Sequence, residues 1–105
     1  MTLREFGKFI ARIDKTAKHH TTAKRGDFTT WEEFERLSAY ADGRNAGGWR
    51  VQVERYTRQE WDDIAYALAD AFDEADNIAV RDHLVDTDTD GENVTIRHLF
   101  DIEVW

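Results

Sequence analysis

The stretch from residue 48 to residue 75 constrains the fold more than any other part of the chain. Trp49, Val51 and Val53 alternate with polar residues, which is the two-residue period of a strand with one wet face. Thr57 and Glu60 have the spacing of a capping box at a helix start. The apolar positions that follow recur at helical spacing: Trp61, Ile64, Ala65, Leu68, Phe72 and Ala75. We therefore predict a strand that leads directly into an amphipathic helix beginning at Thr57.

Composition limits the chain to one domain and removes several kinds of chemistry. Of its 105 residues, 41% are hydrophobic and 12% aromatic, so we expect a single domain over residues 1–105 with a small core. There is no Cys, which excludes disulfides, zinc–thiolate sites and a thiol nucleophile. Charges interrupt the apolar positions of the N-terminus, and no apolar run reaches membrane-spanning length. We therefore expect no signal peptide and no membrane partner.

The net charge of −8 is distributed unevenly. Residues 1–25 carry seven Lys and Arg against two acids, whereas the remaining residues carry seven Arg against twenty acids. We expect the acidic body to repel nucleic acid at long range, while the basic N-terminal segment need not do so.

The first apolar pattern predicts a short helix that starts at Leu3, with Thr2 as its N-cap, and ends near Lys18. The polar segment 19–26 that follows has no period and predicts a loop. Adjacent His19 and His20 are candidate metal ligands, but no acid or third His lies close in the sequence, so we favour a solvated loop. A phosphate contact by its basic residues has weak support in so acidic a chain.

Residues 28–42 fit either a helix or a strand. As a helix, Thr30 opens a second capping box; as a strand, Phe28, Thr30 and Phe34 face one way. The pattern alone favours the helix. In both cases the Gly-rich segment 42–48 predicts a turn or loop, and a hairpin with the next strand follows if the segment before it is extended.

Two alternating segments, residues 77–86 and 93–105, predict a C-terminal hairpin. A three-residue loop at Thr89–Gly91 would set Asp88 opposite Glu92 and align the apolar side chains of both strands on one face. The predicted apolar pairs are Leu84–Ile96, Val80–Phe100 and Ile78–Ile102.

The same register places Asp82 opposite His98 and turns His83 to the other face. An Asp–His pair suggests either a catalytic dyad or a structural hydrogen bond. We favour the hydrogen bond because no nucleophile or third member is evident.

Acidic residues gather at two places. Residues 86–91, Asp-Thr-Asp-Thr-Asp-Gly, imitate the first half of an EF-hand calcium loop, but the twelfth position, which needs a bidentate acid, is Arg97. We favour an acidic hairpin tip without calcium. Asp70, Asp73, Glu74 and Asp76 crowd the end of the predicted helix, where the helix dipole disfavours anions. A partner surface, repulsion of DNA and ordinary solubilising charge all fit that cluster.

Several blocks together resemble a family of phage proteins. They are the N-terminal helix, His19-His20, an aromatic extended segment at 28–31, Tyr40-Ala-Asp-Gly43, Arg50-Val-Gln-Val-Glu-Arg-Tyr-Thr57, the acidic turn and Phe100-Asp-Ile-Glu-Val104. The pattern resembles the tail-completion, or tail-terminator, proteins of long-tailed phages and prophages, and its layout is similar to the phage lambda tail terminator. The resemblance covers nearly the whole chain.

The resemblance implies a strand at residues 28–36, paired with the strand at Trp49. We therefore expect an α+β fold in the order helix–strand–strand–helix–strand–strand. Its sheet is small and mostly antiparallel, with the helices packed on one face. The Glu-rich segment 31–35 departs from the apolar tendency of the family.

The resemblance also implies a structural, non-enzymatic role in the virion, with no cofactor and no metal. Such proteins form a ring, expected here to be six-fold, that ends the tail tube and joins it to the head. The tail-tube and head-connector proteins are the implied partners, and DNA passes through without specific binding. A ring needs a closing head-to-tail interface. From their position in two turns we take as candidate interface residues Asp42, Arg44, Asn45, Asp86, Asp88, Asp90 and Glu92.

Two other classes of function remain as alternatives. The first is a small acidic inhibitor that mimics DNA and occupies a nucleic-acid-binding host protein, with an affinity that falls steeply with salt. The second is an enzyme using Asp82, His98 and His83. We expect no enzyme, because the sequence has no nucleophile elbow, phosphate loop or metal-ligand spacing.

Overall fold

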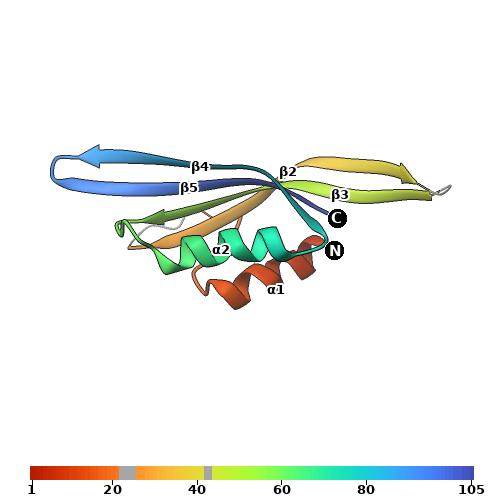
Figure 1. The fold of residues 1–105 in the computed structure, drawn as a ribbon, viewed down its shortest axis with the longest axis horizontal. Coiled ribbons are helices and arrows are strands. Elements are labelled where there is room, and N and C mark those ends of the chain that lie inside the picture. Colours follow the sequence, from red (N-terminus) through yellow and green to blue (C-terminus); the bar gives the residue numbers. More distant parts are fainter. Residues whose placement is uncertain (22–25, 42–43) are drawn as a thin grey trace.

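The computed structural model describes residues 1–21, 26–41 and 44–105. Within these residues the helices and strands follow the order α1 (Leu3–Ile13), β1 (Lys18–His19), β2 (Phe28–Ala41), β3 (Arg44–Thr57), α2 (Asp63–Glu74), β4 (Ile78–Asp90) and β5 (Asn93–Val104). The strands form one sheet in the order β1-β2-β3-β5-β4, antiparallel except for the β1–β2 pair. Both helices lie on one face of it (Figure 1). The predicted α+β fold and element order are confirmed, and β1 is an addition where a loop was expected.

Helix α1 begins at the predicted cap and ends earlier than predicted. The Thr2 side chain accepts a hydrogen bond from the Glu5 N–H at 3.0 Å, and the Glu5 carboxylate accepts one from the Thr2 N–H at 3.1 Å, which completes a capping box. The helix does not continue to Lys18, because Asp14 is extended and its carboxylate accepts from the Thr16 N–H at 2.8 Å. This local bond competes with the helical pattern.

Strand β2 pairs with β3 from Phe28 to Ala41, so the helical alternative for this segment is wrong. Thr29 and Trp31 point into the core, whereas Phe34 lies half exposed at a β-bulge. The pairing shows why the start of this aromatic, β-branched segment is extended: Thr29 and Trp31 are buried and alternate with side chains on the other face.

Most of the loop predicted at 42–48 is also strand, since β3 begins at Arg44. Gly48 pairs with Leu37, and the indole of Trp105 covers it. A Cβ at Gly48 would lie 2.7 Å from that indole. Glycine is therefore needed here for close packing, whereas the sequence interpretation used it as a turn signal.

Helix α2 does not start at Thr57, and the predicted capping box there is wrong. Thr57 is the last residue of β3, and its hydroxyl donates to Asp27 at 2.8 Å and accepts from the Gln59 N–H at 3.0 Å. The helix begins at Asp63, with Asp62 as the N-cap accepting from the Ala65 N–H at 3.0 Å. Trp61, which was predicted on the buried helical face, lies outside the helix and is exposed.

The C-terminal hairpin forms, but in a different register from the predicted one. Asp90 pairs with Asn93 across Gly91, whose φ is 62°, so Asp88 faces Thr95 instead of Glu92. The pairs on the core face are Ile78–Val104, Val80–Ile102 and His83–Phe100. A β-bulge at Arg81 keeps that side chain out of the core and places Ile78 in it, whereas Val80 on the same face is 36% exposed.

The core lies between the two helices and the middle of the sheet. Aromatic rings connect these layers: Phe6 of α1 meets Trp31 edge to face at 5.0 Å, and Phe72 of α2 meets Phe100 at 5.3 Å. Val51 and Val53 are fully buried, which confirms the predicted inner face of β3. Burial of each such side chain contributes about 1.5–3 kcal/mol.

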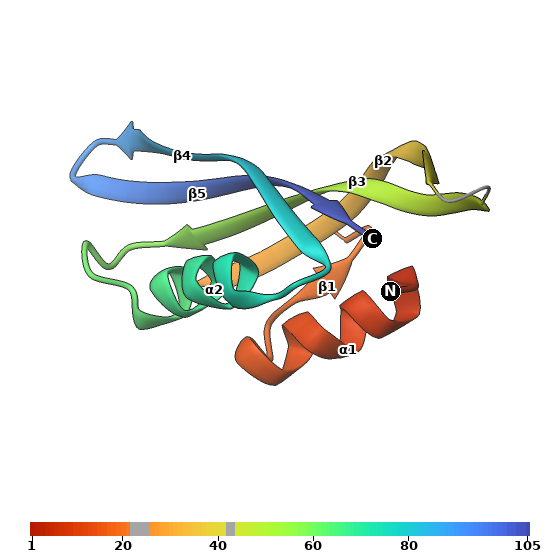
Figure 2. The same cartoon turned by 45° about the vertical axis from the view of Figure 1, so that its right-hand side comes forward.

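The helices cover only the middle of a long sheet. The chain measures 57 × 22 × 21 Å, and two hairpins extend past the helices at opposite ends of the long axis (Figures 1 and 2). We call residues 35–50 the β2–β3 arm and residues 82–97 the β4–β5 arm. Neither helix in the described residues is long and apolar enough to cross a membrane.

Candidate functional site

The acidic residues predicted as an interface lie on the β4–β5 arm. Asp86, Asp88 and Asp90 are two residues apart in β4 and so share one face; Glu92 follows in the turn, and all four are exposed. Because β4 is extended there, the arm does not form an EF-hand-like loop. Arg97 of β5 binds Asp86 at two points, 2.7 and 3.2 Å, and this contact raises the pKa of Arg97. The remaining acids give the face its negative charge.

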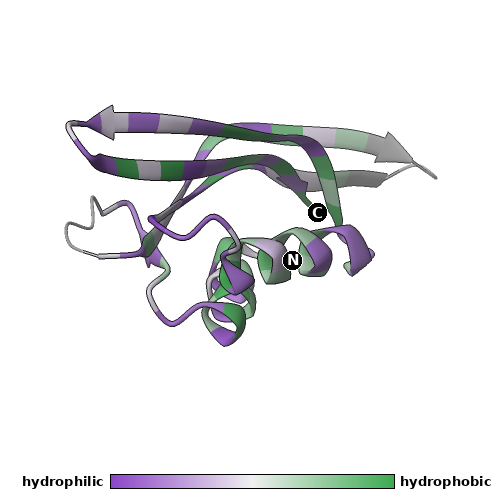
Figure 3. Cartoon of the chain, turned by 60° about the vertical axis from the view of Figure 1, so that its left-hand side comes forward, coloured by the Kyte–Doolittle hydropathy of each residue, from purple (hydrophilic) through white to green (hydrophobic). Residues whose placement is uncertain are grey.

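The opposite face of the same arm is apolar. Figure 3 shows hydrophilic and hydrophobic residues alternating along its strands. The exposed or half-exposed apolar residues on this side, which we call the apolar strip, are Trp61, Tyr66, Val85, Val94 and Ile96.

Contacts place the members of the apolar strip next to one another. Trp61 stacks against Tyr66 at 6.3 Å, Tyr66 meets the ring of His98 at 5.9 Å, and His98 is the strand partner of Val85. The arm continues past the first turn of α2, so the helix does not cover the strip (Figure 1). Trp61 is 74% exposed and Val85 is 55% exposed. Exposed apolar groups that lie together on a surface typically mark an interaction site.

The β2–β3 arm carries arginine and aromatic residues. The Arg36 guanidinium lies over the Trp49 ring at 4.8 Å, and the Arg50 guanidinium lies over Phe34 at 4.7 Å. Arg50 also binds Asp101 of β5 at 2.6 Å. This arm contains three Arg and two acids, whereas the β4–β5 arm contains five acids and one Arg. The two arms therefore differ in charge.

The predicted interface residues thus fall into two groups at opposite ends of the molecule. Arg44 and Asn45 are the first residues of β3, at the tip of the β2–β3 arm, and Asp42 lies outside the described residues. The acids of 86–92 lie at the other end. The structure does not bring the groups together within one chain.

A buried ion cluster around Arg55 was not predicted. Arg55 is 2% exposed and lies on the same face of β3 as Val51 and Val53. It binds Asp62 at 2.8 Å, and two further acids, Asp14 and Asp27, lie at 3.7 and 3.9 Å. The sequence signal was the two-residue period, which continues from Val53 to Arg55.

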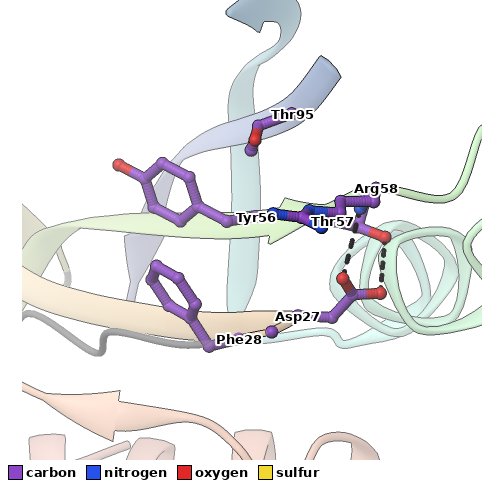
Figure 4. A pocket seen from close by; sticks show the side chains of 7 residues that line it. Asp27, Phe28, Tyr56, Thr57, Arg58 and Thr95 are labelled. Atoms are coloured by element: carbon purple, nitrogen blue, oxygen red, sulfur yellow. Dashed lines mark hydrogen bonds between the residues drawn. The ribbon is translucent and has the colours of Figure 1, made fainter. Parts of the chain in front are cut away.

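Figure 4 shows an open hollow beside the end of β3. It has a volume of about 320 Å³ and is lined by Gly26, Asp27, Phe28, Tyr56, Thr57, Arg58 and Thr95. The Asp27 carboxylate accepts from the Thr57 hydroxyl at 2.8 Å and from the Arg58 N–H at 3.2 Å, and Phe28 stacks on Tyr56 at 4.7 Å. Since Asp27 holds the connection between β3 and α2, we assign the hollow a structural role.

The predicted Asp82–His98 hydrogen bond is not formed, because the register differs. Asp82 is exposed and faces Asp101. Instead, Nδ1 of His98 lies 3.0 Å from Nε2 of His83, a residue that was predicted on the other face. Buried Nε2 of His98 has no hydrogen-bond partner among the described residues. The dyad hypothesis therefore loses its geometric basis.

The two adjacent histidines lie beside an acid that is distant in sequence. Nε2 of His19 is 2.8 Å from Oε2 of Glu33, and Nε2 of His20 is 2.5 Å from Oε1 of the same carboxylate. The interpretation as a simple solvated loop rested on the lack of a nearby acid, and the parallel pairing of β1 with β2 supplies one. Partial burial raises the pKa of Glu33, the two histidine hydrogen bonds lower it, and the net shift is downward.

No protein-family model and no curated protein sequence matches this chain. Functional inference therefore depends on the geometry above and on the pattern of sequence blocks.

Proposed function

We propose that this chain is a structural subunit that associates head to tail through its two arms. In this proposal the subunits close into the ring that ends a phage tail tube and joins it to the head. The observation that carries the proposal is the presence of two chemically different arms at opposite ends of a 57 Å sheet.

The difference in charge favours head-to-tail contact. A symmetric dimer in which like arms met would place the acidic β4–β5 arms together. In a head-to-tail contact the acids on that arm meet Arg36 of the neighbouring β2–β3 arm. Complementary potentials of this kind favour association and set its direction.

The apolar strip supplies the part of the contact that is removed from water. Val85, Val94 and Trp61 each expose apolar surface, and the two valines lie on the face of the arm opposite the acids. Burial of apolar area contributes roughly 25 cal/mol per Å² before the costs of association. In this proposal the strip forms the apolar centre of the contact.

The proposed role in a phage tail is supported by the resemblance of the sequence blocks in addition to this geometry. A ring around a DNA path suits an acidic body, since the net charge of −8 repels the phosphate backbone. The role requires assembly and no chemistry. It places the tail-tube protein on one side of the ring and the head connector on the other.

Assembly is tested by mass photometry and negative-stain electron microscopy of the purified chain over a range of concentrations. We expect closed rings for the wild type and loss of rings for the double variant Val85→Asp/Val94→Asp. Ala11→Asp, which adds a carboxylate to the exposed face of α1, is the matched control and retains rings. Rings that survive the strip variant, or fail equally in the control, would contradict the proposed contact.

The biological role is tested by disrupting the gene in its native genetic element and imaging the particles. Filled heads beside detached tails, or tails of abnormal length, are expected. Normal joined particles would exclude the role. Attention would then turn to the DNA-mimic alternative, which predicts salt-sensitive binding to basic proteins through the acidic arm.

A further inference from the structure

We propose that His19, His20 and Glu33 form a binding site for a divalent transition-metal ion, with Zn²⁺ as the ion that fits best. One ligand atom from each residue can be chosen so that all three lie within 4.8 Å of one another. Two imidazole nitrogens and a carboxylate oxygen form a typical zinc ligand set. This site is separate from the arms and does not depend on the proposed ring.

The ligand atoms are close to the spacing that a bound ion requires. Zn–N and Zn–O bonds of ~2.0–2.2 Å in tetrahedral geometry place neighbouring ligand atoms ~3.3 Å apart. The His19 and His20 nitrogens now lie 2.8 and 2.5 Å from the Glu33 oxygens. An ion would replace these hydrogen bonds after side-chain movements of less than about 1 Å.

The backbone at His20 is what places both rings on one side. Successive residues of a strand point to opposite faces, so an extended His19–His20 pair would separate its rings. His20 instead has a φ of 57°, a left-handed conformation that is uncommon for a residue with a side chain. The two rings therefore lie 3.8 Å apart, centroid to centroid. Local backbone strain of this kind is concentrated at functional sites.

Trp31 fixes the position of both histidines. The His19 ring stacks on the Trp31 indole at 3.9 Å with an interplanar angle of 12°, and the His20 N–H donates to the Trp31 carbonyl at 3.1 Å. Trp31 itself is 5% exposed and belongs to the core. The ligands are thus attached to a rigid part of the sheet, which lowers the cost of ordering them around an ion.

The surroundings favour zinc over calcium or magnesium and leave one coordination position open. Imidazole ligands select zinc and its transition-metal neighbours, whereas calcium and magnesium need oxygen ligands. Oε2 of Glu32 lies 3.9 Å from Nδ1 of His20 and adds negative charge beside the site. The His19 and His20 side chains are 40% and 51% exposed, so the fourth position faces solvent.

Ion binding would stabilise strand β1 at the edge of the sheet. Strand β1 has two residues and one strand partner, β2. A metal ion bound by the histidines and by Glu33 of β2 would stabilise this edge in addition to the few backbone hydrogen bonds between β1 and β2. The expected consequence is a stabilised connection between α1 and β2.

The test is titration of the metal-stripped full chain with Zn²⁺ by calorimetry, and with Co²⁺ followed by its visible absorption. We expect one ion per chain and the absorption of tetrahedral Co²⁺. His20→Asn removes the ligand but keeps a residue that tolerates the left-handed conformation. Glu33→Gln removes the charged oxygen. Each variant is expected to weaken binding at least about tenfold, the lower end of what loss of an outer-shell partner costs.

Two matched controls localise the ion. Glu35→Gln removes a carboxylate from the same strand, and His83→Gln disrupts the other histidine pair. Both controls are expected to bind Zn²⁺ as the wild type does, and circular dichroism checks that each variant is folded. Absence of saturable binding to the wild type, unchanged binding in His20→Asn, or loss of binding in His83→Gln would each overturn the proposal.

Discussion

Arg55 and Asp62 form a two-point ion pair in the interior, with Nε 2.8 Å from Oδ2 and Nη2 3.2 Å from Oδ1. The pair connects the end of β3 to the first turn of α2, where Asp62 is also the N-cap. Asp14, at the end of α1, approaches the same guanidinium. One cation thus joins the end of α1 to the connection between β3 and α2.

Replacement of Arg55 by Met is expected to be strongly destabilising. It leaves the carboxylates of Asp62 and Asp14 buried without their counter-ion, and breaking a buried pair in this way costs about 3–5 kcal/mol. Urea unfolding followed by circular dichroism measures the loss. Arg81→Met is the control, because the Arg81–Glu103 pair is partly exposed and such pairs contribute about 0–1 kcal/mol. Equal losses in the two variants would contradict the assigned role of Arg55.

The free energy of unfolding is expected to decrease as the pH is lowered from 7.5 to 5.5. Burial lowers the pKa of His98 below its ordinary value of 6.5; His83 and Arg55 act in the same direction, and Asp62 opposes them. Burial also lowers the pKa of His83, and Asp73 opposes it. The folded state therefore prefers neutral rings, so their contribution is complete above pH 6.5 and is lost as the pH falls toward the lowered values.

Urea unfolding at several pH values in this window tests the expectation. The acids titrate mainly below it, so the histidines account for the slope. His98→Gln should reduce the change in unfolding free energy between the two pH values. A wild-type stability that is flat across the window would show that the pair is not held neutral.

Substitution of Gly48 by Ala is expected to destabilise the fold by about 1–3 kcal/mol, as overpacking does. The new Cβ would lie 2.7 Å from the Trp105 indole and 2.9 Å from the Val104 carbonyl oxygen. Gly47→Ala is the neighbouring control, since its Cβ would meet only the flexible end of Arg36. If Trp105→Ala removes most of the cost of Gly48→Ala in a double-mutant cycle, the indole contact is the cause.

Mixing two arm variants is expected to distinguish contact between unlike arms from contact between like arms. Val85→Asp/Val94→Asp disables the β4–β5 arm, and Arg36→Glu disables the β2–β3 arm. Each variant alone should fail to associate head to tail, because every contact needs one arm of each kind. A mixture should form dimers that stop at one contact, joined through the two intact arms. Native mass spectrometry measures these species, and homodimers of either variant alone would indicate a symmetric interface.

The elements that the sequence predicted well are those specified by local periodicity. The Thr2 cap, the apolar face of α1 and the alternation of Val51 and Val53 each depend on neighbours within one element. The predicted start of α2 was wrong because the sequence contains two competing N-cap signals, one at Thr57 and one at Asp62. The outcome follows from the ion pair of Asp62 with Arg55, which no local pattern contains.

The sequence did not predict the register of the β4–β5 hairpin or the ligand cluster, for a related reason. Gly91 is compatible with loops of different length, and the bulge at Arg81 compensates for the difference nearer the core. His19 and Glu33 are brought together by a parallel pairing between segments that are not adjacent in the chain. Such contacts depend on tertiary packing, so the residues were visible in the sequence and their proximity was not.

The alternation of side chains along the β4–β5 arm determines how inserted residues would change its surface. Its acidic and apolar sides come from alternate residues of the same strands. A single inserted residue after Leu84, matched by one before Leu99, would leave the helix-covered core in place and invert the arm beyond it. The former wet side would then carry the valines. The two faces therefore depend on the position of each residue in the alternation as much as on composition, and one added residue in each strand could reverse the polarity of the arm.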